Sequence, residues 1–225
     1  LALLRGGTTN MIHGDVGWPG RPDAALESLL TCLREERVAR RERHVLRVRP
    51  EGSDTAHHGF FFGTHAIVRA IVRTRARFHQ RGMRGTVSEL LSATALVWRL
   101  LRRNIDRDPV LAPISLELRR GDGAWRRTSH ILLMATSLRR LILGARPLAA
   151  GQRAGLAELS GPDYRLLPWL WRLFRGRIEA LETLSLRGDV EWILDGEIHR
   201  HHAADGALTV EPAEPAAFLV RRSRS

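Results

Sequence analysis

Two carboxylates flank a glycine near the end of the chain. Asp195 and Glu197 lie on either side of Gly196, between two stretches predicted to be strands, residues 190–194 and 197–201. At such a connection, one carboxylate can act as a general base while the other orients a metal ion or a hydroxyl group. An Asp-Gly pair is also the commonest signal of a short hairpin, so the same residues could simply form the turn.

A glycine-rich turn near the start of the chain is the second candidate site. A short apolar run is followed by Gly6, Gly7, Thr8, Thr9 and Asn10, as at the end of a buried strand that turns into a helix. Glycines let the backbone approach a phosphate or ribose closely, and hydroxyl and amide groups can hydrogen-bond to it at a helix start. A capped helix start without any ligand uses the same residue types.

Three histidines and an aromatic segment are weaker candidates. His199 and His201 share one face of a predicted strand, and His202 follows, but exposed histidines of a hairpin seldom bind metal, so no metal ligand is assigned. Residues 168–175 mix aromatic side chains with arginine, a composition suited to an anionic membrane surface. A core helix explains this segment equally simply, because its apolar side chains can be buried on one face.

Composition restricts the class of protein. Cys32 is the only cysteine of the 225 residues, so an intramolecular disulfide and a cysteine-based zinc site are excluded, and a cytoplasmic location is expected. No apolar run is long enough to span a membrane. The formal charge of +12 would attract nucleic acid or anionic lipid. All 36 basic residues are arginines spread along the chain, so we interpret the charge as a solvated basic surface and expect no nucleic-acid partner.

Apolar periodicity predicts both helices and strands. Helices are predicted over residues 23–34, 64–80 and 87–103. Alternating stretches bounded by turn residues predict strands at 37–48, 58–62, 114–118, 125–137, 178–186, 190–194, 197–201, 207–210 and 217–220. The first of these is expected at a sheet edge, because it ends at a proline.

The order of these elements predicts an α+β fold of two unequal parts. Residues 1–36 are expected to form one strand-turn-helix piece of an α/β layer. Residues 37–220 are expected to form an antiparallel β-sandwich domain with packed helices, and residues 221–225 a disordered tail. Because the chain starts with Leu1 instead of Met, we expect it to be a fragment that lacks an upstream segment.

The two candidate sites and the segments between them resemble the bacterial diacylglycerol kinase and lipid kinase family. The similarity covers essentially the whole chain. It rests on the Gly-Thr-Thr-Asn turn at 7–10, the glycine-flanked aromatic strand at 59–63 with the helix after it, the strand at 130–134, the basic loop at 141–147 and the Asp-Gly-Glu at 195–197.

This resemblance implies a fold, a reaction and roles for residues. Residues 1–36 would be the C-terminal remnant of an α/β nucleotide-binding domain, with Thr8 in contact with ATP. Glu197 would accept the proton of the lipid hydroxyl, and Asp195 would be its acidic partner. The implied activity is transfer of the γ-phosphate of ATP, with Mg²⁺, to a diacylglycerol-like lipid at the inner face of the membrane. A peripheral membrane contact is expected, and a homodimer stays open.

Departures from the family pattern are also present. The family's Gly-Gly-Asp-Gly-Thr motif, which precedes the glycine-rich turn, is absent, so ATP binding by this chain is expected to be impaired. The acidic loop that holds a structural Mg²⁺ would fall at residues 155–163, where only Glu158 and Asp163 are acidic, and no metal is assigned there. Two other functions stay open: an NAD-kinase-like enzyme and a non-catalytic module that binds anionic lipid or nucleic acid.

Overall fold

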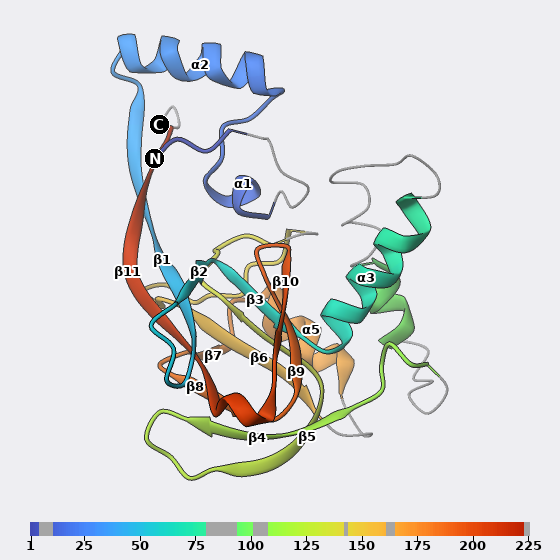
Figure 1. Cartoon of the computed structure of the whole chain (residues 1–225). Coiled ribbons are helices and arrows are strands. Elements are labelled where there is room, and N and C mark those ends of the chain that lie inside the picture. The colour runs from blue at the N-terminus through green and yellow to red at the C-terminus, as the bar shows by residue number, and fades with distance from the viewer. Residues whose placement is uncertain (5–10, 80–93, 101–107, 142–143, 161–164, 223–225) are drawn as a thin grey trace.

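The computed structural model describes residues 1–4, 11–79, 94–100, 108–141, 144–160 and 165–222 (Figure 1). One antiparallel sheet curls around a hydrophobic core, and helices lie outside it. The predicted α+β class is confirmed.

Eleven strands of the described chain form this sheet, and all the paired strands are antiparallel. The strand order is β10-β9-β3-β5-β4-β8-β11-β1-β2, and β6 pairs with both β5 and β7. The strands are β1 (Val38–Pro50), β2 (His57–Gly59), β3 (Phe61–Thr64), β4 (Ile114–Arg120), β5 (Arg126–Thr136), β6 (Gly155–Ser160), β7 (Glu179–Ala180), β8 (Leu184–Arg187), β9 (Val190–Leu194), β10 (Glu197–His201) and β11 (Ala207–Arg221).

The two ends of the strand order come close together. His57 of β2 lies edge-on against Trp192 of β9, with ring centroids 5.4 Å apart. One curled sheet therefore supplies both facing walls of the predicted sandwich. Alternate side chains point inward, as Leu184 and Leu186 of β8 show, and both are fully buried in the core.

The helices of the described chain pack against the outer face of the sheet or against its long extension. They are α1 (Met11–Val16), α2 (Pro22–Arg34), α3 (Ala66–His79), α5 (Leu166–Phe174) and the short 3-10 helix η2 (Ala203–Asp205), and residues 94–100 are also helical. Val68 of α3 and Leu173 of α5 share an apolar cluster with Met134 of β5. These contacts explain the apolar stripe that predicted α3 from the sequence. The predicted helix at 87–103 lies partly outside the described residues.

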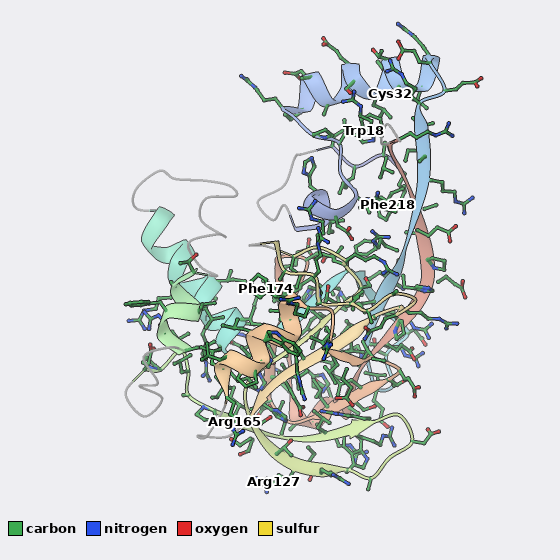
Figure 2. The ribbon with its side chains drawn as sticks, turned by 180° about the vertical axis from the view of Figure 1, so that it is seen from behind. Trp18, Cys32, Arg127, Arg165, Phe174 and Phe218 are labelled. Atoms are coloured by element: carbon green, nitrogen blue, oxygen red, sulfur yellow. The ribbon has the colours of Figure 1, made fainter. Side chains whose placement is uncertain are left out.

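The N-terminal segment packs against the part of β1 and β11 that extends beyond the rest of the sheet (Figures 1 and 2). Trp18 is buried beneath α2 with Cys32, and its indole nitrogen donates a hydrogen bond of 2.8 Å to the carbonyl oxygen of Leu219. The guanidinium of Arg43 donates two hydrogen bonds to the carboxylate of Asp15, at 2.7 and 3.0 Å, and both side chains are buried. An apolar contact and a buried ion pair thus fix this segment on the β1–β11 ribbon.

The sequence predicted two separate strands at 207–210 and 217–220. The structure has one strand there, β11, which runs without a break from Ala207 to Arg221. Two prolines interrupt the apolar alternation, but they pair with β1, where the register shifts between His44 and Leu46. Strand β8 pairs with β11 only up to Val210, so among the described strands the other edge of β11 has no partner at its prolines. Proline is tolerated at such a free edge because it has no N–H to donate.

Strand β1 has β2 as a second partner only at residues 46–48, so among the described strands the rest of β1 lies at a sheet edge as predicted. Two further strand predictions were wrong in detail. The strand predicted at 178–186 is two strands, β7 and β8, and the strand predicted at 58–62 is divided at Phe60 into β2 and β3. Residues 223–225 of the predicted tail lie outside the described residues, and Arg221 belongs to β11.

Candidate functional site

The β9–β10 hairpin contains the Asp-Gly-Glu sequence. Leu194 pairs with Glu197, which leaves Asp195 and Gly196 as the two residues of the turn. Both have positive φ angles, 48° and 102°, as a two-residue turn of type I′ requires. The hairpin interpretation of this Asp-Gly pair is therefore confirmed. It does not exclude a chemical role for the residues beside it.

The carboxylate of Asp195 ties this turn to the connection between β2 and β3. Its two oxygens accept hydrogen bonds of 2.9 Å from the backbone nitrogens of Phe60 and Phe61. The backbone nitrogen of Asp195 donates a third bond, of 3.0 Å, to the carbonyl oxygen of Phe61. Since both carboxylate oxygens are engaged, Asp195 acts as a positioning residue for the turn.

The same contact explains a glycine of the aromatic strand. A Cβ atom at Gly59 would lie 2.6 Å from Cγ of Leu194 and 2.7 Å from Oδ2 of Asp195. The close approach of the turn to β2 therefore requires glycine at this position.

Opposing effects act on the proton affinity of Asp195. Burial raises the pKa of this carboxyl group from 3.8 to about 6, and the hydrogen bonds from Phe60 and Phe61 oppose that rise. The negative charge of Glu197 raises the pKa further. Burial has the largest effect, so ionisation of this carboxyl group costs more free energy in the folded protein than in water.

Glu197 is the other carboxylate of the hairpin and lies at the start of β10. Its side chain is exposed, in contrast to the half-buried Asp195. Within the described ranges, no side chain or backbone group donates a hydrogen bond to it. Its oxygens are therefore accessible to a hydroxyl group of a substrate.

A cluster of rings lies behind the hairpin. The imidazole of His199 stacks on the indole of Trp192, with centroids 4.2 Å apart and planes at 17°. The ring of His57 lies 4.5 Å from that of His199, so the cluster joins β2 to β9 and β10. Burial and the neighbouring His57 lower the pKa of His199, although the charge of Glu197 opposes them. The neutral imidazole favoured here is suited to packing against the indole.

The three histidines considered as metal ligands are not brought together. His201 is buried, with Nε2 3.2 Å from the carbonyl oxygen of Gly206, whereas His202 is exposed, with Nδ1 3.6 Å from a carboxylate oxygen of Asp189. No group of three or more His, Cys, Asp or Glu side chains in the described part of the chain is arranged to hold a metal ion.

The glycine-rich turn predicted to bind a nucleotide falls in an undescribed part of the chain. Gly6, Gly7, Thr8, Thr9 and Asn10 all lie outside the described residues.

The segment at 155–163, where the resemblance would put an acidic loop, begins instead as strand β6. Glu158 of this strand forms an ion pair of 2.7 Å with Arg120, and Asp163 lies outside the described residues.

Comparison with known proteins gives a similarity in fold and none in sequence family. A scan against protein-family models and a search of curated proteins each give no match. A solved structure of a proposed diacylglycerol kinase from Bacillus anthracis str. Sterne matches 98% of this chain and 69% of its own, with a TM-score of 0.57 and 13% identity. The chain has a diacylglycerol kinase-like fold. A second structure, of a diacylglycerol kinase from the same strain, matches 99% of this chain and 66% of its own, with a TM-score of 0.50 and 12% identity.

The similarity to solved diacylglycerol kinases thus confirms the fold expected from the motifs. This chain spans about two thirds of the length of those structures. Sequence reasoning identified the Asp-Gly-Glu turn but not the bonds from Asp195 to Phe60 and Phe61. The glycine-flanked aromatic strand was the signal available for them, since Gly59 leaves the space that the turn occupies.

Proposed function

We propose that the chain is part of an ATP-dependent lipid kinase that phosphorylates the hydroxyl group of a diacylglycerol-like lipid. The observation that carries the proposal is the division of work between two carboxylates of one turn. Asp195 is held by the backbone nitrogens of Phe60 and Phe61, whereas Glu197 is exposed. A fixed turn that presents one accessible carboxylate is suited to general-base catalysis.

In this proposal Glu197 accepts the proton of the attacking lipid hydroxyl as the oxygen–phosphorus bond forms. Asp195 keeps the turn in place and does not itself exchange a proton with the substrate. ATP with Mg²⁺ supplies the phosphoryl group and neutralises its charge. Thr8, with the glycine turn around it, is the proposed contact to the nucleotide, and residues 1–36 are the proposed remnant of the nucleotide-binding domain.

A lipid substrate implies contact with a membrane, and helix α5 is the segment best suited to it. Leu167, Trp171 and Phe174 of this helix are exposed by 72, 49 and 41%. The guanidinium of Arg177 lies 4.7 Å from the ring centroid of Trp171, so a positive charge accompanies the apolar surface. Apolar and basic side chains together favour the surface of an anionic bilayer. No helix in the ranges that the structure describes is long and apolar enough to cross a membrane.

The test is transfer of radiolabelled γ-phosphate from ATP to diacylglycerol in mixed micelles, with protein expressed from the full reading frame of the gene. Glu197→Gln should lower kcat by about 10²- to 10⁴-fold, the usual contribution of a general base. Glu191→Gln is the matched control, because Glu191 is an exposed carboxylate of the same hairpin, paired with Arg200. This control should retain its activity.

Other outcomes distinguish the alternative functions. Phosphorylation of NAD instead of lipid would support the NAD-kinase-like alternative. Binding to anionic vesicles that falls steeply with salt, without phosphoryl transfer to any lipid of a panel, would contradict the kinase proposal and support a non-catalytic module. Equal activity of Glu197→Gln and the unmodified protein would exclude Glu197 as the base.

A further inference from the structure

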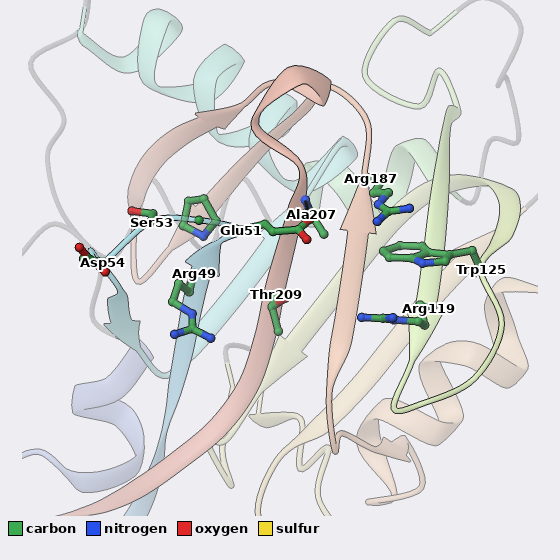
Figure 3. A pocket seen from close by; sticks show the side chains of 11 residues that line it. Arg49, Glu51, Ser53, Asp54, Arg119, Trp125, Arg187, Ala207 and Thr209 are labelled. Atoms are coloured by element: carbon green, nitrogen blue, oxygen red, sulfur yellow. Dashed lines mark hydrogen bonds between the residues drawn. The ribbon is translucent and has the colours of Figure 1, made fainter.

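A cavity of about 410 Å³ opens on the outer face of the sheet, where β1 and β11 come near the β4–β5 hairpin (Figure 3). Ligand pockets are typically of this size or larger. Three arginines line the cavity: Arg49 of β1, Arg119 of β4 and Arg187 of β8. The turn after β1 and the first residues of β11 complete the walls.

Strand register places two of these arginines in one row. Arg49 pairs with Thr209, Thr209 with Ser185, and Ser185 with Arg119, across four neighbouring strands. Residues directly opposite each other point to the same face of a sheet, and so do residues two apart on one strand. Arg187 therefore shares the face of Ser185, and all three guanidinium groups project away from the core.

Trp125 separates two of the guanidinium groups. Its indole lies between them, with the central guanidinium carbon of Arg187 4.2 Å and that of Arg119 4.8 Å from the ring centroid (Figure 3). Guanidinium groups stack favourably on indole faces. The stack fixes both guanidinium groups in orientation, so little conformational entropy is lost when their outer nitrogen atoms bind a ligand.

None of these three arginines forms an ion pair with a carboxylate of the described residues. Among the described residues, no Asp or Glu oxygen lies within ion-pair distance of Arg49, Arg119 or Arg187, and Nε of Arg119 is buried without a hydrogen-bond acceptor. Nearby arginines do have such partners: Arg47 pairs with Glu211, Arg120 with Glu158 and Glu179, and Arg200 with Glu191. The guanidinium groups of the cavity therefore have no ion-pair partner in the part of the chain that the structure describes.

Two carboxylates, Glu51 and Asp54, also line the cavity, so the five charged side chains of its lining carry a net charge of +1. Oε2 of Glu51 accepts a hydrogen bond of 2.8 Å from the backbone nitrogen of Ala207 and is therefore engaged. Asp54 lies in the turn beyond β1, on the far side of the cavity from Trp125 (Figure 3). Neither carboxylate contacts a guanidinium of the cavity.

We propose that this cavity binds a phosphate group, carried either by a free phosphate monoester or by the head group of an anionic lipid. Guanidinium groups match phosphate oxygens by donating pairs of parallel hydrogen bonds. The site is separate from the Asp-Gly-Glu turn, because none of the residues that line the cavity belongs to β9, β10 or the turn between them. The inference therefore does not depend on the proposed kinase activity.

The first test is calorimetric titration of the protein with inorganic phosphate and with glycerol 3-phosphate. Arg49→Gln should weaken binding about tenfold, because loss of a charge-assisted hydrogen bond is worth about that factor. This variant leaves the stack on Trp125 intact. Arg187→Gln should weaken binding similarly, and its thermal unfolding is measured to confirm that it folds.

Two control variants separate binding in the cavity from general attraction to a basic protein. Arg200→Gln removes the same charge from an exposed arginine that pairs with Glu191 outside the cavity, and it should change the affinity less than twofold. Glu197→Gln should leave phosphate binding unchanged, even if it abolishes kinase activity. Equal loss of affinity in Arg49→Gln and Arg200→Gln would mean non-specific charge attraction and would overturn the proposal, as would unchanged affinity in both Arg49→Gln and Arg187→Gln.

The source of the phosphate is decided with vesicles of phosphatidylcholine, with and without phosphatidic acid. A lipid head group is the ligand if the protein binds only the vesicles with phosphatidic acid and Arg49→Gln reduces this binding. A free phosphate monoester is the ligand if glycerol 3-phosphate binds and Arg49→Gln binds both vesicle types as the unmodified protein does. Absence of binding to inorganic phosphate, glycerol 3-phosphate and both vesicles would refute the site.

Discussion

Replacing Asp195 with Asn should change how the stability of the protein depends on pH. The carboxyl group is half-buried, and burial raises its pKa from 3.8 to about 6. The native state therefore binds a proton more tightly than the unfolded state. The stability that this group contributes is greatest below about pH 4 and is lost as the pH rises through about 6. Asn cannot ionise, so the variant lacks this dependence.

The magnitude follows from the size of the pKa change. Each tenfold change in proton affinity is worth about 1.4 kcal/mol, so a rise from 3.8 to about 6 corresponds to about 3 kcal/mol. Between about pH 4 and about pH 7, the unmodified protein should lose about 3 kcal/mol of unfolding free energy relative to Asp195→Asn. In the variant, the amide oxygen of the side chain accepts one of the two backbone hydrogen bonds, but the amide nitrogen cannot accept the other. The loss of this bond lowers the stability of the variant by an amount that does not depend on pH.

Urea unfolding of both proteins over this pH range measures the difference directly. Two results would refute the reasoning. If the difference in unfolding free energy is independent of pH, the pKa of Asp195 is the same in both states. If the unmodified protein gains stability relative to the variant as the pH rises, the bonds from Phe60 and Phe61 outweigh burial, and the pKa is lowered instead.

Two further substitutions test the packing of the site and of the N-terminal segment. Gly59→Ala places a Cβ atom 2.6 Å from Cγ of Leu194 and should cost about 1–3 kcal/mol of unfolding free energy, measured by urea unfolding. Gly14→Ala is the control, because Gly14 has open space around it and no positive φ, and this variant should lose no stability. Arg43→Gln leaves the buried carboxylate of Asp15 without its counter-charge. This variant should lose about 3–5 kcal/mol of unfolding free energy, measured by urea unfolding. A loss below about 1 kcal/mol would contradict the burial of this ion pair.

Local patterns in the sequence predicted the elements whose stability is local. The apolar stripes of α2 and α3 repeat within one helix, and the Asp-Gly pair specifies a turn of two residues. Such signals need only a short window of sequence. The Asp-Gly-Glu turn was accordingly recognised both as a hairpin and as a candidate site.

Features that depend on distant segments could not be predicted in this way. The bonds from Asp195 to Phe60 and Phe61 join residues about 135 positions apart. Likewise, the continuity of β11 through its prolines depends on β1, which lies at the other end of the sequence. A window of neighbouring residues contains no information about either contact.

The arginine cavity is the clearest case of this limit. Arg49, Arg119 and Arg187 are three of 36 arginines spread along the chain, and no local pattern groups them. The strand register brings them together on one face. An even distribution of charge in the sequence is therefore compatible with a concentrated charge in the structure.

The long pairing of β1 with β11 has a consequence for how the protein folds. It joins Val38 to Arg221, almost the full length of the chain, and β8 and β2 pair with these same two strands. Folding rates fall as contacts join residues further apart in sequence, so this domain should fold slowly. During synthesis the sheet cannot be completed until β11 has left the ribosome, and until then the edges of β1 and β8 stay open to pairing with other chains.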